Sequence, residues 1–202
     1  MLLSLVKNLF HPRVPKSTDV FPRPSTAPLR LHIGGQISHP DWEILDVRPG
    51  ALVDYVGHCT DLSAFADASI VEIYASHVIE HLAYQRELGL ALSEFHRVLV
   101  PGGYVRISVP DLPTLCSLYL DPALNFDERF HVLRMIFGGQ VNRDDFHYLG
   151  FNEELLTSCL QKSGFSDISR IDDFGLFDDC SSLIFRNKPI SLNVCARKPT
   201  TK

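Results

Sequence analysis

Residues 70–111, "IVEIYASHVIEHLAYQRELGLALSEFHRVLVPGGYVRISVPD", decide the fold class because they contain a strand, a helix and a second strand in that order. The β-branched and aromatic runs at 70–75 and 104–109 predict the two strands. Residues 77–99 between them predict the helix. Two strands joined by a crossover of this length pair in parallel, so the stretch indicates an α/β fold.

The helix predicted at 77–99 has an apolar stripe and an acidic outer face. The stripe consists of residues three or four positions apart: Leu88, Leu92, Phe95 and Leu99. The outer face is marked by Glu80, Glu87 and Glu94. The "PGG" at 101–103 ends the helix, since Gly and Pro commonly follow helix C-termini.

The same alternation continues on both sides of this stretch. Further strands are predicted at 29–33, 43–47, 52–56, 167–171 and 190–196. Helices are predicted to begin after Asp111, at Asn125 with Glu128 as its capping-box partner, and at Asn152. This order predicts a mostly parallel sheet with helices on both faces and an antiparallel pair of C-terminal strands.

The composition is that of an ordinary globular protein. Hydrophobic residues make up 45% of the 202 positions and charged residues 21%, which suits a single domain, placed here at 29–202. The net charge of −5 and the lack of a basic stripe argue against a nucleic-acid partner. Five widely spaced cysteines without a C-x-x-C pair predict reduced thiols, a cytoplasmic protein and no structural metal site.

Residues 1–28 are predicted to form a short helix and a proline-rich linker. The "MLLSLVKNLF" start lacks the long apolar core of a signal peptide, and no segment approaches the roughly 20 apolar residues of a membrane span. The helix could pack on the domain or on a partner, or touch a membrane weakly. We therefore expect no stable membrane insertion, and the oligomeric state stays open.

Several polar residues and glycines fall where the predicted strands end. In parallel sheets ligands bind beyond the carboxyl ends of the strands. The candidates there are Gly34, Gly35, Gln36, Asp46, Val47, Asp61, Leu62, Ser76 and His77. Each also has a purely structural interpretation: the glycines as a turn, Asp46 as a solvated strand end, and Asp61 as a helix cap. Taken together, two acids beside a glycine turn suit an adenosine, because carboxylates accept hydrogen bonds from ribose hydroxyls and the adenine amino group.

The stretch 61–111, from "DLSAFADASIVEIYASHVIEHL" to "RVLVPGGYVRISVPD", resembles the class I S-adenosylmethionine-dependent methyltransferases, particularly methyltransferase type 11. The resemblance extends roughly over 29–197 and implies a Rossmann-like methyltransferase fold with S-adenosylmethionine as cofactor. It implies the following contacts: the methionine part at Gly34 and Gly35, the ribose at Asp46, the adenine at Asp61 and Leu62, and the sulfonium near Ser76 and His77.

The sequence departs from this family at "IGGQ", where Gln36 stands in place of an alternating glycine. The crossover from Gly34 to Trp42 is too short for a long helix, so we expect a loop or a single turn. It also argues against a dinucleotide, whose pyrophosphate requires a helix N-terminus. Gln36 could bind the methionine carboxylate, or it could block the pocket.

Three histidines are candidates for accepting a proton from a methyl acceptor: His77, His81 and His147. His77 and His81 could instead form a metal pair, but no third ligand is evident. Segment 121–151 is predicted to cover the acceptor side; alternatively, Phe146 and Tyr148 only pack beneath a helical cap. The sequence thus predicts methyl transfer to a small-molecule, sugar or lipid acceptor. The alternative is a degenerate methyltransferase fold that acts as a binding or scaffold module.

Overall fold

The structure is a computed structural model that describes residues 28–200, so the helix and linker predicted at 1–28 lie almost wholly outside the described residues. The strands are β1 (Leu29–Ile33), β2 (Glu43–Asp46), β3 (Tyr55–Val56), β4 (Ile70–Ser76), β5 (Leu99–Pro110), β6 (Ser166–Ile171), β7 (Ile184–Phe185), β8 (Lys188–Pro189) and β9 (Ser191–Arg197). The α-helices are α1 (Glu87–Val98), α2 (Leu112–Tyr119), α3 (Phe126–Phe137) and α4 (Glu153–Lys162). Two 3-10 turns, Ile79–His81 and Cys180–Ser182, complete the elements.

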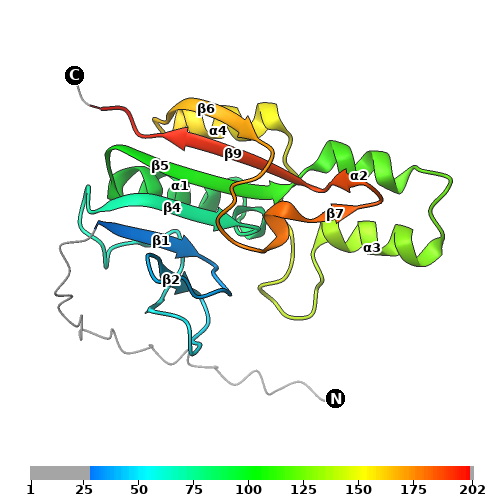
Figure 1. Cartoon of the computed structure of the whole chain (residues 1–202), viewed down its shortest axis with the longest axis horizontal. Coiled ribbons are helices and arrows are strands. Elements are labelled where there is room, and N and C mark those ends of the chain that lie inside the picture. Colours follow the sequence, from blue (N-terminus) through cyan, green and yellow to red (C-terminus); the bar gives the residue numbers. More distant parts are fainter. Residues whose placement is uncertain (1–27, 201–202) are drawn as a thin grey trace, which may run out of the picture.

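A seven-stranded sheet in the order β3-β2-β1-β4-β5-β9-β6 forms the centre of the molecule (Figure 1). Strands β1 to β5 pair in parallel, whereas β9 is antiparallel to both β5 and β6. The prediction of a mostly parallel sheet with an antiparallel C-terminal pair is therefore confirmed. The small β7–β8 hairpin was not predicted.

One face of the sheet is covered by α1 and α4, which lie behind it in Figure 1. Alternate residues of the strands, such as Ile73 on β4 and Val105 on β5, point to this side and are fully buried. They pack in one cluster with Phe95 of α1 and Leu160 of α4. The spacing of three or four residues seen in the sequence is what turns these helix side chains toward the sheet.

The opposite face is covered by the tail segment 172–183 rather than by a helix (Figure 1). Phe177 packs there against Trp42 and Tyr74 in a separate aromatic cluster. As predicted, the crossover from Gly34 to Trp42 is a loop, which leaves this face open for the tail. Helices on both faces of the sheet were expected, and the structure differs in this respect.

The helix predicted at 77–99 begins only at Glu87, because the chain turns sharply after β4. His77 has a φ of 53°, in the left-handed region, and a single 3-10 turn follows at Ile79–His81. Leu82 is extended, and the Glu87 carboxylate accepts a hydrogen bond from the Ala83 N–H at 2.8 Å. The apolar spacing is helical only from Leu88 onward.

Local signals for the later helices were accurate. Asn125 and Glu128 form the predicted capping box, and the Asn152 side chain accepts a hydrogen bond from the Leu155 N–H at 2.8 Å. Asp111 precedes α2 but its carboxylate accepts from the Thr114 hydroxyl instead of a backbone N–H. Within residues 28–200, no helix is long and apolar enough to cross a membrane.

Candidate functional site: the cavity at the carboxyl ends of the strands

A cavity of about 750 Å³ opens at the carboxyl ends of β1, β2 and β4. Of the predicted cofactor residues, the structure brings six to its wall: Gly34, Gln36, Asp46, Val47, Ser76 and His77. The wall also includes His58 and Cys59, which follow β3, and His81. The cavity therefore lies where ligands bind in parallel α/β sheets.

The glycine turn is required by packing inside the chain. Gly34 has a φ of +71°, and a side chain there would meet Val78 at 2.7 Å. Its N–H donates to the Leu45 carbonyl at 2.8 Å, which joins β1 to β2. A side chain at Gly35 would meet the His32 ring at 2.8 Å, and Gly35 itself is not among the lining residues. The turn interpretation thus accounts for both glycines.

Asp46 ends β2 with its side chain 7% exposed at the cavity wall. One carboxylate oxygen accepts the Arg48 N–H at 2.8 Å, and the other accepts the Gln36 side-chain amide at 3.3 Å. Gln36 therefore bridges the glycine turn and the acid, a contact that the sequence did not indicate. A carboxylate oxygen has two acceptor positions, so each can take a further hydrogen bond.

Asp61 and Leu62 are not brought to the cavity wall. Leu62 is fully buried in the core, and its N–H donates to the Glu94 carboxylate at 2.7 Å. Asp61 accepts the Ser63 N–H at 3.1 Å, as expected of a local turn. His58 and Cys59 line the wall in this region instead.

His77 is held through both ring nitrogens. Ser191 donates its hydroxyl proton to the Cys180 carbonyl at 2.7 Å, so its oxygen accepts from His77 Nε2 at 2.9 Å. Nδ1 lies 3.3 Å from Glu80 Oε1. These contacts fix the ring at the cavity wall and leave it no free nitrogen.

Glu80 is the centre of a histidine cluster and not part of a solvated helix face, so the prediction of an outer acidic face is wrong at this residue. Its side chain is fully buried, and neither carboxylate oxygen has a hydrogen bond of standard geometry. Its ion-pair contacts among the described residues are His77 and His147, the latter with Nε2 4.0 Å from Oε1. Glu80 was missed because the helical spacing was extended ten residues too far.

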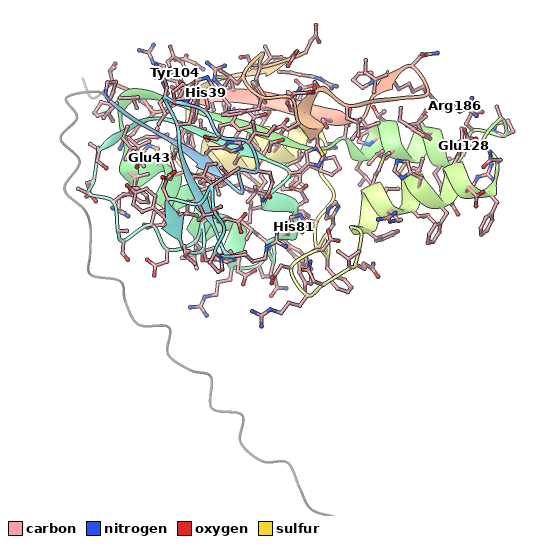
Figure 2. The ribbon with its side chains drawn as sticks, turned by 60° about the horizontal axis from the view of Figure 1, so that its bottom comes forward. His39, Glu43, His81, Tyr104, Glu128 and Arg186 are labelled. Carbon is pink, nitrogen blue, oxygen red and sulfur yellow. The ribbon has the colours of Figure 1, made fainter. Side chains whose placement is uncertain are left out.

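His81 and His147 meet beside Glu80. Their ring centroids are 4.7 Å apart, and His81 Nδ1 donates to the Phe146 carbonyl at 3.1 Å. Figure 2 shows His81 next to the loop that leads from α3 to α4. Unlike His81, His147 is not among the lining residues of the cavity.

Burial and charge act against each other in this cluster. Burial opposes the charge of Glu80, but contact with His77 and the nearby His81 and His147 outweigh it and lower the pKa of the carboxyl. Burial lowers the pKa of His147, although the charge of Glu80 opposes this. The cluster therefore favours an ionised carboxylate that requires a positive neighbour.

Part of segment 121–151, the loop after α3, reaches the cavity, whereas its role as a cover on the acceptor side stays a prediction. Arg143, Asp144 and Tyr148 line the cavity, and Tyr148 is 59% exposed, which argues against simple packing under a cap. A second pocket of about 540 Å³ lies next to it, between α2 and α3, and Tyr148 and His147 line it.

The tail also contributes to the wall, which the sequence did not predict. Asp179 and Cys180 line the cavity although they lie more than 90 residues beyond β4 in the chain. Asp179 is held by the Tyr74 hydroxyl at 3.0 Å and the Ser181 N–H at 2.8 Å. Only the pairing of distant strands brings them there, so no local pattern could have indicated them.

Comparisons with known proteins support the resemblance. Residues 42–107 match a family model described as a methyltransferase domain. No curated protein sequence matches the chain significantly. Among solved structures, the chain is similar to an S-adenosylmethionine-dependent methyltransferase from Archaeoglobus fulgidus, with a TM-score of 0.54 and 17% identity over 86% of this chain and 87% of that one.

Two further solved structures are similar to the chain in fold. One is the 1,6-didemethyltoxoflavin-N1-methyltransferase of Burkholderia thailandensis with bound S-adenosylhomocysteine, with a TM-score of 0.51 and 18% identity over 85% of this chain and 71% of that one. The other is a possible exported protein from Bordetella parapertussis, with a TM-score of 0.53 and 14% identity over 85% of this chain. The chain spans only 62% of the Bordetella protein.

The Archaeoglobus protein is described as dependent on S-adenosylmethionine, and the Burkholderia structure contains S-adenosylhomocysteine. The resemblance seen in the sequence is confirmed: the chain has the class I methyltransferase fold, and its residues 42–107 match the methyltransferase domain family.

Proposed function

We propose that the protein transfers a methyl group from S-adenosylmethionine to a small-molecule, sugar or lipid acceptor in this cavity. The observation that carries the proposal is the cavity itself, with the buried carboxylate of Asp46 at its wall. Its volume of about 750 Å³ falls within the range of about 300–1,000 Å³ typical of cofactor pockets.

The residues present fit an adenosine. The two oxygens of Asp46 each retain an acceptor position after binding Arg48 and Gln36, which suits two ribose hydroxyls. Val47 and Cys59 line the adjoining wall, where the flat adenine ring would lie. We place the base there rather than at Asp61 and Leu62.

The cofactor supplies an electrophilic methyl group on a sulfonium, and the chain aligns it with the acceptor and excludes water. We assign the methionine end to Gly34 and Gln36, and the transferred methyl to the end near Ser76 and His77. The acceptor would enter beneath the loop 138–151. His81 and His147 are its proposed polar neighbours.

The second pocket indicates what kind of acceptor suits the site. Its wall is formed mainly by apolar residues, namely Leu112, Tyr119, Leu120, Leu133, Ile136 and Phe137. Because Tyr148 lines both pockets, an acceptor could place a polar group in the cavity and an apolar part between α2 and α3. This favours a lipid or another acceptor with an apolar part.

A scaffold module without catalysis is the second candidate, and the Gln36–Asp46 hydrogen bond favours it because it takes up one acceptor position of the proposed ribose-binding carboxylate. Calorimetry of the full chain with S-adenosylmethionine and S-adenosylhomocysteine separates the two. The methyltransferase proposal expects one-to-one binding of both molecules. A folded protein that binds neither would support the scaffold and overturn the proposal.

A further inference from the structure

We propose that Glu80, His81 and His147 bind a divalent transition-metal ion in the wall between the two pockets. One potential ligand atom from each residue lies within 4.8 Å of the others. An ion with bonds of about 2.0–2.2 Å holds its ligands roughly 3–4 Å apart, so a small inward movement completes the site. The 4.0 Å separation of His147 Nε2 and Glu80 Oε1 already has this value.

The orientation of His81 supports metal binding. Its Nδ1–H donates to the Phe146 carbonyl at 3.1 Å, so Nε2 carries the lone pair. Histidines that bind metals usually donate the other ring N–H to a carbonyl or carboxylate in this way. The hydrogen bond fixes both the tautomer and the direction of the free nitrogen.

The carboxylate of Glu80 provides an independent indication. It is fully buried, and neither of its oxygens has a hydrogen bond of standard geometry. Within residues 28–200, the ion-pair contacts of Glu80 are histidines, and no lysine or arginine makes one. A fully buried carboxylate whose ion-pair contacts are histidines alone is costly, and an ion would add a full positive charge and a direct ligand contact.

The donor set indicates the class of ion. Two imidazoles and one carboxylate suit Zn²⁺, Mn²⁺, Fe²⁺ or Co²⁺, whereas Mg²⁺ and Ca²⁺ prefer oxygen ligands. Three protein ligands also leave coordination positions open, as in metal sites that bind substrates. His77, 3.3 Å from Glu80, acts as a positioning residue for the carboxylate.

The place of the ion suggests its role. His81 lines the cofactor cavity and His147 lines the apolar pocket, so the open positions face the proposed acceptor path. An ion there would hold an acceptor hydroxyl and lower its pKa. This role rests on the proposed function, but binding of the ion does not.

The test uses the full chain, freed of metal by a chelator, and follows Co²⁺ by its visible absorption and Zn²⁺ by calorimetry, without cofactor. We expect one ion per chain, no displacement of Co²⁺ by millimolar Mg²⁺, and at least tenfold weaker binding in Glu80→Gln and His81→Asn. The matched control is His131→Asn, an exposed histidine on α3, which should bind as the parent does.

Three results would overturn the proposal: no one-to-one binding, parental binding in His81→Asn, or an equal loss in His131→Asn. Circular dichroism checks folding, and His147→Asn replaces Glu80→Gln if the buried substitution unfolds the chain. Binding of S-adenosylhomocysteine is measured on the same samples. If the parent binds S-adenosylhomocysteine but no metal ion, the metal site is refuted and the proposed function is not. If the parent binds the metal ion but not S-adenosylhomocysteine, only the proposed function is refuted.

Discussion

The two faces of the sheet are covered in different ways. On one face, α1 and α4 pack through regularly spaced apolar residues close to the strands in sequence. On the other, Trp42 from the short crossover, Tyr74 from β4 and Phe177 from the tail meet from three distant parts of the chain. The helical face is a stable platform, while the aromatic face joins the short crossover to the segment that brings Asp179 and Cys180 into the cavity.

The comparison shows which contacts cover the sheet where no helix lies between β1 and β2. Phe177 packs on His32 with ring centroids 4.2 Å apart and on Trp42 at 5.6 Å. Asn193 of β9 holds the tail segment in place by donating to the carbonyls of Asp172 at 3.0 Å and Ser181 at 2.9 Å. On the aromatic face, the tail thus couples stability to the shape of the cavity, because the same segment packs against Trp42 and carries Asp179 and Cys180.

The largest expected effect compares one truncation on each face. Phe177→Ala, on a residue 8% exposed, should cost about 3–5 kcal/mol of unfolding free energy, and Leu160→Ala on α4 about 2–5 kcal/mol. Urea denaturation measures both losses. Only Phe177→Ala should also weaken S-adenosylhomocysteine binding, because it releases the tail from the cavity. Equal binding by the two folded variants would contradict the coupling.

His32 gives the aromatic face its own pH dependence. Burial lowers the pKa of His32 to about 4, although nearby Asp179 opposes this, while an unfolded histidine has a pKa of about 6.5. Between pH 4 and pH 6.5, His32 is therefore protonated in the unfolded chain but neutral in the folded chain. The contribution of neutral His32 to the free energy of unfolding is therefore complete above about pH 6.5. It is lost as the pH falls through 4, and this loss amounts to about 3 kcal/mol.

Denaturation of the parent and of His32→Phe at pH 7, 5 and 4 tests this expectation. The phenyl ring keeps the contacts with Tyr74 and Phe177 but cannot take up a proton. His32→Phe should therefore lose about 3 kcal/mol less than the parent between pH 7 and pH 4. Parallel pH profiles for the two proteins would show that His32 does not titrate in the folded chain as described.

Two acids test the cofactor site beside the aromatic face, Asp46 and Asp61, both of which the sequence predicted as cofactor contacts. Asp46→Ala should weaken S-adenosylmethionine binding at least tenfold, or about 1.4 kcal/mol, because a carboxylate bound by ribose hydroxyls contributes about 1.5–3 kcal/mol. Asp61→Ala should have little effect, since Asp61 does not line the cavity. Calorimetry measures both. A larger loss in Asp61→Ala would restore the original adenine assignment.

How much the sequence predicted depends on how local each signal is. The succession of most strands and helices along the chain, the capping box at Asn125 and the N-cap at Asn152 rest on residues close together in the chain, and all three were predicted. Asp46 and Ser76 were located at the cavity because parallel strands share one carboxyl edge.

The rest depends on tertiary contacts or on backbone conformation. The left-handed φ of His77 turns Glu80 inward, and nothing in the residue types of "SHVIEHL" distinguishes that turn from a helix start. Asp179 and Cys180 reach the cavity only because β9 pairs with β5. Likewise, the Gln36–Asp46 contact joins two strand ends whose separation the sequence does not specify.

The smallest expected effect concerns Gln36, which links the crossover to the cofactor edge. Its amide nitrogen carries two hydrogens, so it can hold Asp46 and still donate to the methionine carboxylate of the cofactor. Gln36→Gly should therefore weaken cofactor binding by about 0.5–1.5 kcal/mol, the value of an ordinary hydrogen bond. Calorimetry with S-adenosylmethionine gives the difference directly.

Two matched variants make the sign of this effect decisive. Gln36→Ala separates the lost amide from the added flexibility of glycine, and denaturation of both variants measures that flexibility. Gln36→Glu places a like charge beside Asp46 and beside the cofactor carboxylate, so its loss should exceed that of Gln36→Gly. Tighter binding of S-adenosylmethionine by Gln36→Gly and Gln36→Ala would show instead that Gln36 obstructs the cofactor site. That result would support the scaffold module over the methyltransferase.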